Sequence, residues 1–555
     1  PKLSHLLFAD DSLVCCKANV QVAKQMKEMF AVYERASGQA INYEKSAVFF
    51  SANTKNELRK EICAELGNMK EAGNGRYLGL PMLVGRSKQQ VFSYIRHKVK
   101  DKLQGWKRNL LSHAGKEILI KSVAMALPTY TMSCFKLPKV LCKDINKMIA
   151  NFWWGGGENE RKIHWTSWEK MSQVKGKGGL GFRDLEKFNE ALLAKQLWRI
   201  LSCPDLLVSK IMRAKYLAQP QNWEKDIPGA ASWTWKSIFG TRQLLTKGLG
   251  KIIGDGRTVD IWQDNWLQGS EEGRIKTRRE PQCTLRKVDE LIVDGAWDQQ
   301  TLNRWFIAED IQKIKAIPLS ITGCQDRLYW RYTKSGVFTV KSAYDVSMEI
   351  RKHKQKERRQ GDSGSTSYAQ QNSKVWKNVW ALQLKHKLKH FIWRCLHHSL
   401  PVNEQLHKRT GKGSPICSSC GEEVETLEHM LFFCNIAETT WKLAPIQWDG
   451  LKDMRGNFVR WWEGILGAKT REQGQEHIAL TVNILWQIWK ARNRTAFDVY
   501  ETDPRKTMQK AVGEWNEYIE AQQDITGEFI QQTTNSSRSK KWRPPSRGTI
   551  KLNTD

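Results

Sequence analysis

Three cysteines and one histidine lie close together in the stretch ICSSCGEEVETLEHMLFFC, residues 416–434. Cys417 and Cys420 form a C-x2-C pair, and His429 is followed by Cys434 after four intervening residues. Two thiolates on a tight turn, followed by a His–Cys pair about one helical turn apart, can converge tetrahedrally on zinc. Because protein ligands then fill all four positions, we expect a structural Zn²⁺ site. The alternative is a group of ordinary buried cysteines.

A zinc site of this kind limits how its surroundings fold. Its binding free energy, on the order of 10 kcal/mol or more, would largely be the folding free energy of the small module around it. The remaining cysteines are scattered, which favours a reducing compartment over a disulfide framework. We predict that the other histidines nearby are surface or core residues and not ligands; they are His386, His390, His397, His398 and His407.

Charge is the second constraint on this 555-residue chain, which is long enough for two to four domains. The net charge is +31, from 89 basic and 58 acidic residues spread along the sequence. Such a field attracts polyanions, so we expect RNA and DNA as partners and no membrane. No apolar run approaches the roughly 18 residues of a membrane span, and no secretory signal is present. We therefore expect a nuclear or cytoplasmic protein that is not secreted.

The N-terminal stretch HLLFADDSLVCC, residues 5–16, predicts a strand, a turn and a strand with Asp10 and Asp11 at the tip. Adjacent carboxylates repel each other, and a divalent cation such as Mg²⁺ relieves that repulsion. Two such ions can drive in-line phosphoryl transfer. The alternative is a simple turn exposed to water. Apolar spacing predicts a helix next, ended by Gly38.

Residues 41–51 alternate as a strand does, and residues 76–82 predict a short strand or turn. From about 88 to 150 the pattern is helical and basic, with Val91, Ile95, Val99 and Leu103 on one face. We expect a second helix here, capped by Ser112 and running to Leu127. The basic faces are either solvated surface or a contact with a phosphate backbone.

Residues 151–350 are rich in tryptophan and glycine. The segment GKGGLGF, residues 176–182, lacks the context of a phosphate-binding loop, so we interpret it as a turn before a helix over 185–201. GDGRTVDIW, residues 254–262, is interpreted as a turn between strands. Of the 25 tryptophans in the chain, most are expected in cores, although tryptophan also stacks on bases. The composition predicts polar linkers at 351–373 and 531–541, and a core helix at 478–497.

Several of these segments together resemble one protein family. FADDSL resembles the F/Y-x-D-D box of reverse transcriptases, SGQAINYEKS resembles the following palm block, and YLGLPM resembles the primer-grip segment. The match is closest to plant non-LTR (LINE-type) retrotransposon proteins, which residues 102–139 also resemble. Residues 376–441 resemble the zinc-binding domain of these enzymes, and KWRPPSRGTIKLNTD resembles the first strand of a ribonuclease H domain.

The resemblance implies roles for individual residues. Asp10 and Asp11 would be the palm carboxylates that bind Mg²⁺, and Lys45 would donate a proton to departing pyrophosphate. The primer-grip residues would be Tyr77, Leu78 and Gly79. Asp555 matches the first catalytic carboxylate of ribonuclease H. An intact parent enzyme would copy RNA into DNA on a template-primer, with residues 90–140 as a thumb-like region.

The resemblance also has gaps. The family's palm needs a third carboxylate on an upstream strand and a fingers region, and only nine residues precede Asp10. The missing initiator Met and the end at Asp555 lead us to expect a fragment with an incomplete catalytic set for both reactions. The expected function is therefore a fragment of an RNA-directed DNA polymerase that binds nucleic acid and is inactive as it stands. The alternative is a non-catalytic, zinc-stabilised nucleic-acid-binding protein derived from a retrotransposon.

The expected fold is an α+β multidomain chain. It would contain a partial polymerase palm hairpin, a helical thumb and connector, a small helical zinc-binding domain and the first strand of a ribonuclease H-like domain. Nothing in the pattern indicates an oligomeric state. The expected segments are 1–85 palm end, 86–150 thumb-like helices, 151–350 Trp/Gly-rich connector, 351–373 disordered linker, 374–445 zinc-binding domain, 446–530 helical segment, 531–541 linker and 542–555 truncated start of ribonuclease H.

Overall fold

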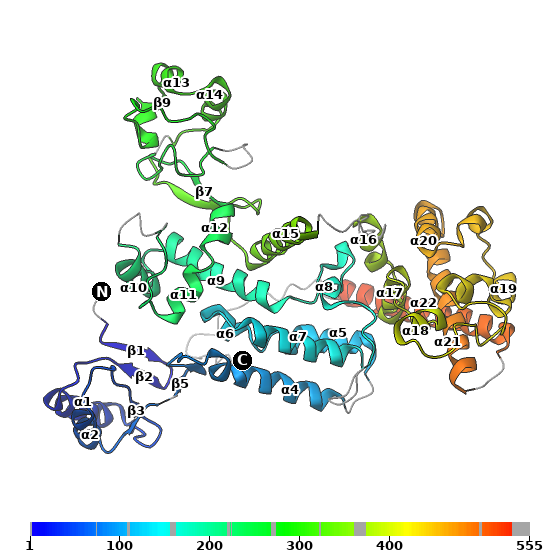
Figure 1. The fold of residues 1–555 in the computed structure, drawn as a ribbon, viewed down its shortest axis with the longest axis horizontal. Helices are drawn as coiled ribbons and strands as arrows, with labels where there is room; N and C mark the ends of the chain where they lie inside the picture. The colour runs from blue at the N-terminus through cyan, green and yellow to red at the C-terminus, as the bar shows by residue number, and fades with distance from the viewer. Residues whose placement is uncertain are drawn as a thin grey trace. The chain divides into compact units, whose positions relative to one another are not determined.

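The computed structural model is rich in helices and carries a few small sheets (Figure 1). It describes residues 3–73, 75–107, 111–155, 162–218, 223, 225–267, 273–320, 323–359, 373–498 and 502–535. The chain divides into two compact units, each described here by itself: Pro1–Lys102 with Ala124–Asn146 and Asp184–Asp362, and Leu103–Val123 with Lys147–Arg183 and Ser363–Asp555. Within the described ranges every sheet has two strands, which is compatible with the expected α+β class.

The first unit begins with the predicted hairpin. Strands β1 (His5–Phe8) and β2 (Asp11–Val14) are antiparallel, with Phe8 opposite Asp11. Ala9 and Asp10 therefore form the turn, and Ala9 takes a left-handed φ of 51°. The predicted strand, turn and strand are confirmed, but the tip lies one residue earlier than expected, because Asp11 is already the first residue of β2. Helix α1 (Val20–Ser37) follows and ends as predicted at Gly38, whose φ of 71° suits glycine.

The strand predicted over residues 41–51 is mostly wrong. Only β3 (Ala47–Val48) forms, in a parallel pair with β4 (Lys70–Glu71). The Asn42 side chain accepts a hydrogen bond from the Lys45 N–H at 3.0 Å, and the Asn42 carbonyl accepts one from Ser46 at the same distance. These local bonds satisfy the backbone in a turn and compete with an extended strand. Helix α2 (Asn56–Glu65) packs against α1 around Ala23 and Ile62.

Residues 76–82 form the predicted short hairpin. Strands β5 (Arg76–Tyr77) and β6 (Leu80–Pro81) pair antiparallel through a two-residue loop. Leu78 and Gly79 have φ of 48° and 75°. Left-handed backbone at both loop positions matches the right-handed twist of hairpin strands, although a leucine there is strained.

Residues 88–153 are largely helical, as predicted. Ile95, Val99 and Leu103 are buried, which confirms most of the predicted apolar face. Ser112 caps a helix as expected, but that α-helix ends at Leu119 and not at Leu127, with a π-helical turn over Ile120–Ala124. The Ser122 hydroxyl donates to the Ile118 carbonyl at 2.7 Å, which perturbs the regular ladder there. The helices are α3 (Lys88–Val91), α4 (Ser93–Lys107), α5 (His113–Leu119), α6 (Thr129–Cys134) and α7 (Lys139–Trp153).

Helix α9 (Leu185–Ser202) is the centre of the first unit and confirms the helix predicted over 185–201. It is packed by α6, α10 (Leu207–Tyr216), α11 (Trp233–Phe239), α12 (Arg242–Gly248) and α15 (Val340–Arg359) (Figure 1). Trp235 and Trp330 are almost fully buried in this core, as expected for most tryptophans. The other elements are β7 (Leu249–Ile252) paired with β10 (Arg327–Trp330), β8 (Ile292–Val293) paired with β9 (Ala296–Trp297), α13 (Gln299–Trp305) and α14 (Ala308–Lys315).

The GDGRTVDIW segment follows β7 as a turn, in line with its interpretation. Asp326 holds it by accepting hydrogen bonds from the backbone N–H groups of Gly254 at 2.7 Å and Gly256 at 2.9 Å. Thr258 donates both its N–H and its hydroxyl to the same carboxylate. Burial opposes ionisation of Asp326, but these donors outweigh it and lower its pKa.

The described residues of the second unit form helices joined by turns and loops, with one isolated antiparallel bridge between Ile416 and Val424. Its long apolar helix α21 (Gly474–Asp498) is buried along most of its length, which confirms the core helix predicted at 478–497. Trp376, Trp393, Trp461 and Trp462 are also core residues. The other helices are α8 (Trp168–Met171), α16 (Ser373–Ala381), α17 (His386–Leu396), α18 (Asn403–Thr410), α19 (Asn435–Lys442), α20 (Phe458–Leu466) and α22 (Pro504–Asn535).

Both predicted linkers begin as helix. Helix α15 continues through residues 351–359, and α22 continues through residues 531–535. Lys, Arg, Glu and Gln are good helix formers, so a helix with a packed first half extends into such a sequence. The remaining linker residues, 360–372 and 536–541, and the predicted ribonuclease H segment 542–555 lie outside the described residues. Within the described chain, no helix is both long enough and apolar enough to span a membrane.

Candidate metal centre

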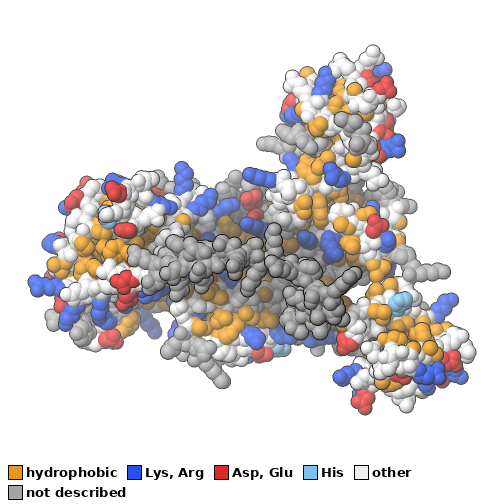
Figure 2. Space-filling model, turned by 180° about the vertical axis from the view of Figure 1, so that it is seen from behind, with side chains coloured by type: hydrophobic (Ala, Val, Ile, Leu, Met, Phe, Trp, Pro, Cys, Tyr) orange, Lys and Arg blue, Asp and Glu red, His pale blue; other side chains and the backbone are white. Residues whose placement is uncertain are grey.

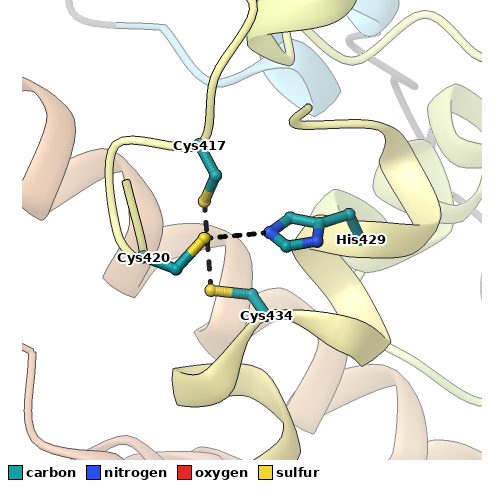
Figure 3. Close-up of side chains that lie close together, drawn as sticks. All are labelled: Cys417, Cys420, His429 and Cys434. Carbon is teal, nitrogen blue, oxygen red and sulfur yellow. Dashed lines mark hydrogen bonds between the residues drawn. The ribbon is translucent and has the colours of Figure 1, made fainter. Parts of the chain in front are cut away.

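The structure brings the four predicted zinc ligands together (Figure 3). Their ligand atoms all lie within 4.8 Å of one another. The Sγ atoms of Cys417 and Cys434 are 3.9 Å apart, and Cys420 Sγ lies 3.4 Å from His429 Nε2. Figure 3 shows the four side chains pointing at one centre from four directions.

These distances fit a tetrahedral zinc ion. With Zn–S near 2.3 Å and Zn–N near 2.1 Å, tetrahedral angles place two sulfurs about 3.8 Å apart and a sulfur and a nitrogen about 3.6 Å apart. The ring of His429 is also held through its second nitrogen, because Nδ1 lies 3.0 Å from a carboxylate oxygen of Glu423. A carboxylate on the second ring nitrogen is the usual way in which proteins fix a metal-binding histidine.

The local backbone explains how so few residues form the site. Cys417 donates its N–H to the Glu423 carbonyl at 2.8 Å, and Gly421 donates its N–H back to Cys417 at 2.9 Å. Gly421 takes a φ of 74°, which lets the chain turn back directly after Cys420. The ligand His429 opens a π-helical turn, His429–Phe433, and Cys434 closes it by donating its N–H to the His429 carbonyl at 2.8 Å.

The thiols are also electrostatically prepared to bind a cation. The neighbouring Cys434 thiol, with backbone N–H groups of Cys420 and Ser419, lowers the pKa of Cys417 to about 4 against the effect of burial. The same contact with Cys417 raises the pKa of Cys434. The pair therefore holds one thiolate at neutral pH, and the thiolate is the form that ligates metal.

A buried ion pair between Glu425 and Arg492 connects the loop that holds the ligands to helix α21. Glu425, fully buried, accepts from Arg492 of α21 at 2.7 Å and 2.5 Å. Its Oε2 also accepts the Asn403 N–H at 2.6 Å. Glu423 and Glu425 belong to an acidic stretch between the two ligand pairs, but the sequence does not indicate what each of them contacts. Arg492 lies too far along the chain to be linked to it by pattern alone.

A second group of metal-ligating side chains surrounds Glu117 of α5. Its carboxylate lies 2.8 Å from His390 Nε2 and 3.8 Å from His386 Nε2, and both histidines belong to α17. However, Lys121 and Lys175 already donate to its other oxygen at 2.5 Å and 2.8 Å. Two ammonium groups would repel an added divalent cation, so this group is better described as a buried ion-pair network.

The GKGGLGF segment packs on the same helix. The Gly178 carbonyl accepts from Trp393 Nε1 at 2.9 Å and lies 2.7 Å from His397 Nε2. A Cβ on Gly178, whose φ is 87°, would lie 2.9 Å from the Trp376 ring. Burial lowers the pKa of His397 to about 4 despite its bond to the Gly178 carbonyl. The glycines therefore allow this segment to pack closely against neighbouring helices, which agrees with the interpretation of the segment as a turn.

The predicted polymerase residues do not form a cluster comparable to that of the zinc ligands. Asp10 and Asp11 are exposed on the β1–β2 hairpin, and Lys45 is exposed in the turn after α1. Among the residues that the structure describes, Asp10 and Asp11 join no group of three or more metal-ligating side chains. Asp555 lies outside the described residues.

The predicted primer-grip residues lie at a cavity. Tyr77 and Leu78 line a cavity of about 300 Å³, and Gly79 is exposed in the loop beside it. Tyr130 of α6 and Phe135, just after that helix, also line this cavity. Lysine and arginine side chains are scattered over the visible surface and are not confined to one region (Figure 2).

Comparison with known proteins places these features in a family. The family described as zinc-binding in reverse transcriptase matches residues 338–441, so the match begins before the predicted boundary at 374 and contains all four ligands. A putative ribonuclease H protein of Arabidopsis thaliana is 26% identical over 485 residues, which cover 86% of this chain and 75% of the relative. An uncharacterized mitochondrial protein of the same plant is 46% identical over 144 residues, covering 26% of this chain and 94% of the relative.

The family match and the Cys3His cluster agree on zinc as the metal. The relatives extend the similarity well beyond that region. The chain belongs to the family of these Arabidopsis proteins, and it is a retrotransposon-related protein that carries a zinc-binding domain of the reverse-transcriptase kind.

Proposed function

We propose that this chain is the nucleic-acid-binding, zinc-stabilised part of a non-LTR (LINE-type) reverse transcriptase and does not polymerise DNA by itself. The observation that carries the proposal is the convergence of Cys417, Cys420, His429 and Cys434 within the region that matches the reverse-transcriptase zinc-binding family. The net charge of +31 supports RNA and DNA as the partners, because phosphate contacts dominate nucleic-acid affinity.

The role of the metal in this proposal is structural. The three cysteines and His429 would hold Zn²⁺, which when bound supplies free energy for folding and leaves no position open for water. Glu423 orients His429 from behind, and Glu425 ties the backbone of Asn403 to Arg492 of the core helix. The domain would thereby present a fixed surface to nucleic acid.

The proposed lack of polymerase activity rests on the N-terminal hairpin. Asp10 and Asp11 match the residues that would bind Mg²⁺ in the intact enzyme, and Lys45 matches a candidate proton donor. Two exposed carboxylates are too few for the paired ions of in-line phosphoryl transfer, and no third metal-ligating side chain joins them in the described part of the chain. The same observation favours the second candidate, a non-catalytic nucleic-acid-binding protein derived from a retrotransposon.

Two assays on the purified full-length chain test the proposal. Binding to a labelled template-primer should weaken steeply as salt rises, because cations released from phosphates drive the association. Primer extension with Mg²⁺ and deoxynucleotides should be absent, and Asp10→Ala should bind the template-primer as well as the parent does. Extension that disappears in Asp10→Ala would instead assign polymerase activity to this chain, and absence of salt-sensitive binding would refute the nucleic-acid role.

A further inference from the structure

A cavity lies beside the β5–β6 hairpin in the first unit. It holds about 300 Å³, and its lining is mostly apolar. This is the lower end of the size range of small-ligand sites, so it suits one planar group and not a duplex. Its lining residues are Tyr77, Leu78, Leu80, Pro81, Met82, Tyr130 and Phe135.

Aromatic side chains stand on both walls. Tyr77 comes from the hairpin, and Tyr130 and Phe135 come from α6 and the residue that follows it. Phe135 is buried and its ring packs 5.6 Å from Phe92, whereas 53% of Tyr130 is exposed to solvent. The α6 wall therefore combines a buried, well-packed ring, Phe135, with a solvent-accessible ring, Tyr130.

The α6 wall is tied to the helix next to it. The hydroxyl of Tyr94 in α4 lies 2.8 Å from the Thr131 hydroxyl, one residue after Tyr130. This hydrogen bond fixes the rim of the cavity against α4. It also ties α4 to the residue next to Tyr130.

Cationic side chains lie close to residues that line or adjoin the cavity. The guanidinium of Arg76, which precedes Tyr77, lies 3.9 Å from the centre of the Tyr94 ring. The ammonium of Lys98 lies 5.7 Å from the same ring. Lys136 is exposed and follows Phe135 directly. An apolar aromatic slot flanked by cations is complementary to an unpaired base with its phosphates.

We propose that this cavity binds one unpaired base of a single-stranded nucleic acid, stacked on Tyr130, with the flanking phosphates held by Arg76, Lys98 and Lys136. The inference rests on the proposed nucleic-acid-binding function and adds a location and a strand state to it. Stacking on an aromatic ring tolerates any base, because every base has a π-face. Phosphate contacts fix the strand without reading its sequence.

The test uses the full-length chain, two fluorescent single strands (oligo-U RNA and oligo-dT DNA of equal length) and a fully paired blunt duplex. Tyr130→Ala should weaken single-strand binding by roughly fivefold or more, because stacking on one aromatic ring contributes at least that much. Tyr33→Ala is the matched control, since Tyr33 is 52% exposed on α1 and does not line the cavity. It should bind both strands as the parent does.

The three nucleic-acid probes distinguish the possible results. A loss with RNA, with DNA or with both supports the cavity and identifies the strand that it takes. An equal loss with the duplex, or no loss with either single strand, overturns the cavity proposal while the proposed function stands. Failure of the parent chain to bind any of the three probes removes both proposals.

A second experiment uses the parent chain and therefore does not require any variant to fold. An oligonucleotide that carries 5-iodouracil, irradiated on the parent chain, should cross-link to Tyr130 or Tyr77, as mapped by mass spectrometry. Cross-links confined to other parts of the chain would overturn the proposal. Charge-removing variants Arg76→Gln and Lys136→Gln should each reduce the slope of log affinity against log salt by about 0.7 for a single strand.

Discussion

Arg492 and Glu425 form a two-point ion pair that is buried on both sides. Arg492 Nε lies 2.7 Å from Glu425 Oε1, and Nη2 lies 2.5 Å from Oε2. The two side chains are 5% and 0% exposed. Because one partner belongs to the core helix α21 and the other to the loop between the two ligand pairs, this contact joins the candidate zinc centre to the hydrophobic core.

Breaking the pair from one side should be costly. We expect Arg492→Met to lower the free energy of unfolding of the second unit by about 3–5 kcal/mol, because it leaves the buried Glu425 carboxylate without its charged partner. Urea unfolding followed by tryptophan fluorescence measures the loss. Lys408→Ala, which breaks the exposed pair with Glu404, should cost at most about 1 kcal/mol. A similar loss in both variants would contradict the role given to Arg492.

Removing the Glu423 carboxylate, which contacts His429, should weaken zinc binding without unfolding the domain. Glu423→Ala should lower zinc affinity by roughly 10-fold to 100-fold, because Glu423 orients the His429 ring. Competition with a chromophoric chelator measures the affinity. Glu422→Ala is the matched control, since Glu422 is also exposed and neighbours Glu423 in the same loop. Equal affinities in the two variants would show that the Glu423 contact does not act on the metal.

The glycine of the GKGGLGF segment should not tolerate a side chain. Gly178→Ala should destabilise the second unit by about 2 kcal/mol or more, because the residue has a left-handed φ and its Cβ would press on the Trp376 ring. Gly176→Ala should have a much smaller effect, since its Cβ would meet only the flexible Lys377 side chain at 3.3 Å. Thermal unfolding of both variants tests the difference. Unchanged stability in Gly178→Ala would reopen a role for this segment in ligand binding.

Acid should release a contact between three helices. Glu514 of α22 accepts from Gln487 and Lys490 of α21 and from Lys387 of α17. Burial raises its pKa, but these three donors outweigh burial and lower the pKa from 4.5 to about 2. The unfolded chain therefore binds the proton first as pH falls. The stabilisation is complete above about pH 4.5 and is lost as pH falls towards 2.

The experiment measures the midpoint of unfolding as a function of pH for the parent chain and two variants. Glu514→Gln should be less stable than the parent at neutral pH, and the gap should close through this acid range. Glu520→Gln, an exposed position on the same helix, should track the parent at every pH. A gap that stays constant as pH falls would show that the Glu514 charge does not contribute.

Local signals predicted the local structure well. The hairpin around Asp10, the helix stop at Gly38, the capping by Ser112 and the helix over 185–201 each follow from turn, cap or periodicity rules that act over a few residues. The four zinc ligands are also close in the sequence, so their convergence could be read from spacing. The strand over 41–51 failed because side-chain hydrogen bonds of Asn42 compete locally with pairing.

Long-range relationships could not be predicted in this way. Nothing near Gly178 in the sequence indicates that its carbonyl meets Trp393, and nothing near Glu425 indicates Arg492. The sequence predicts that the histidines of α17 lie in the core or on the surface. It does not identify Glu117 as the partner of His390. Such partners depend on how distant helices pack, and hydrophobic periodicity specifies a buried face without naming its neighbour.

The zinc content of the purified full-length chain decides whether the four clustered side chains hold a structural metal ion. Elemental analysis should find one zinc per chain, and Cys417→Ser should lose it. Hydrogen exchange should show that removal of zinc by a chelator exposes the amides of residues 416–441, because metal binding and folding are coupled there. A metal-free chain whose amides in that region stay as protected as before would contradict the account.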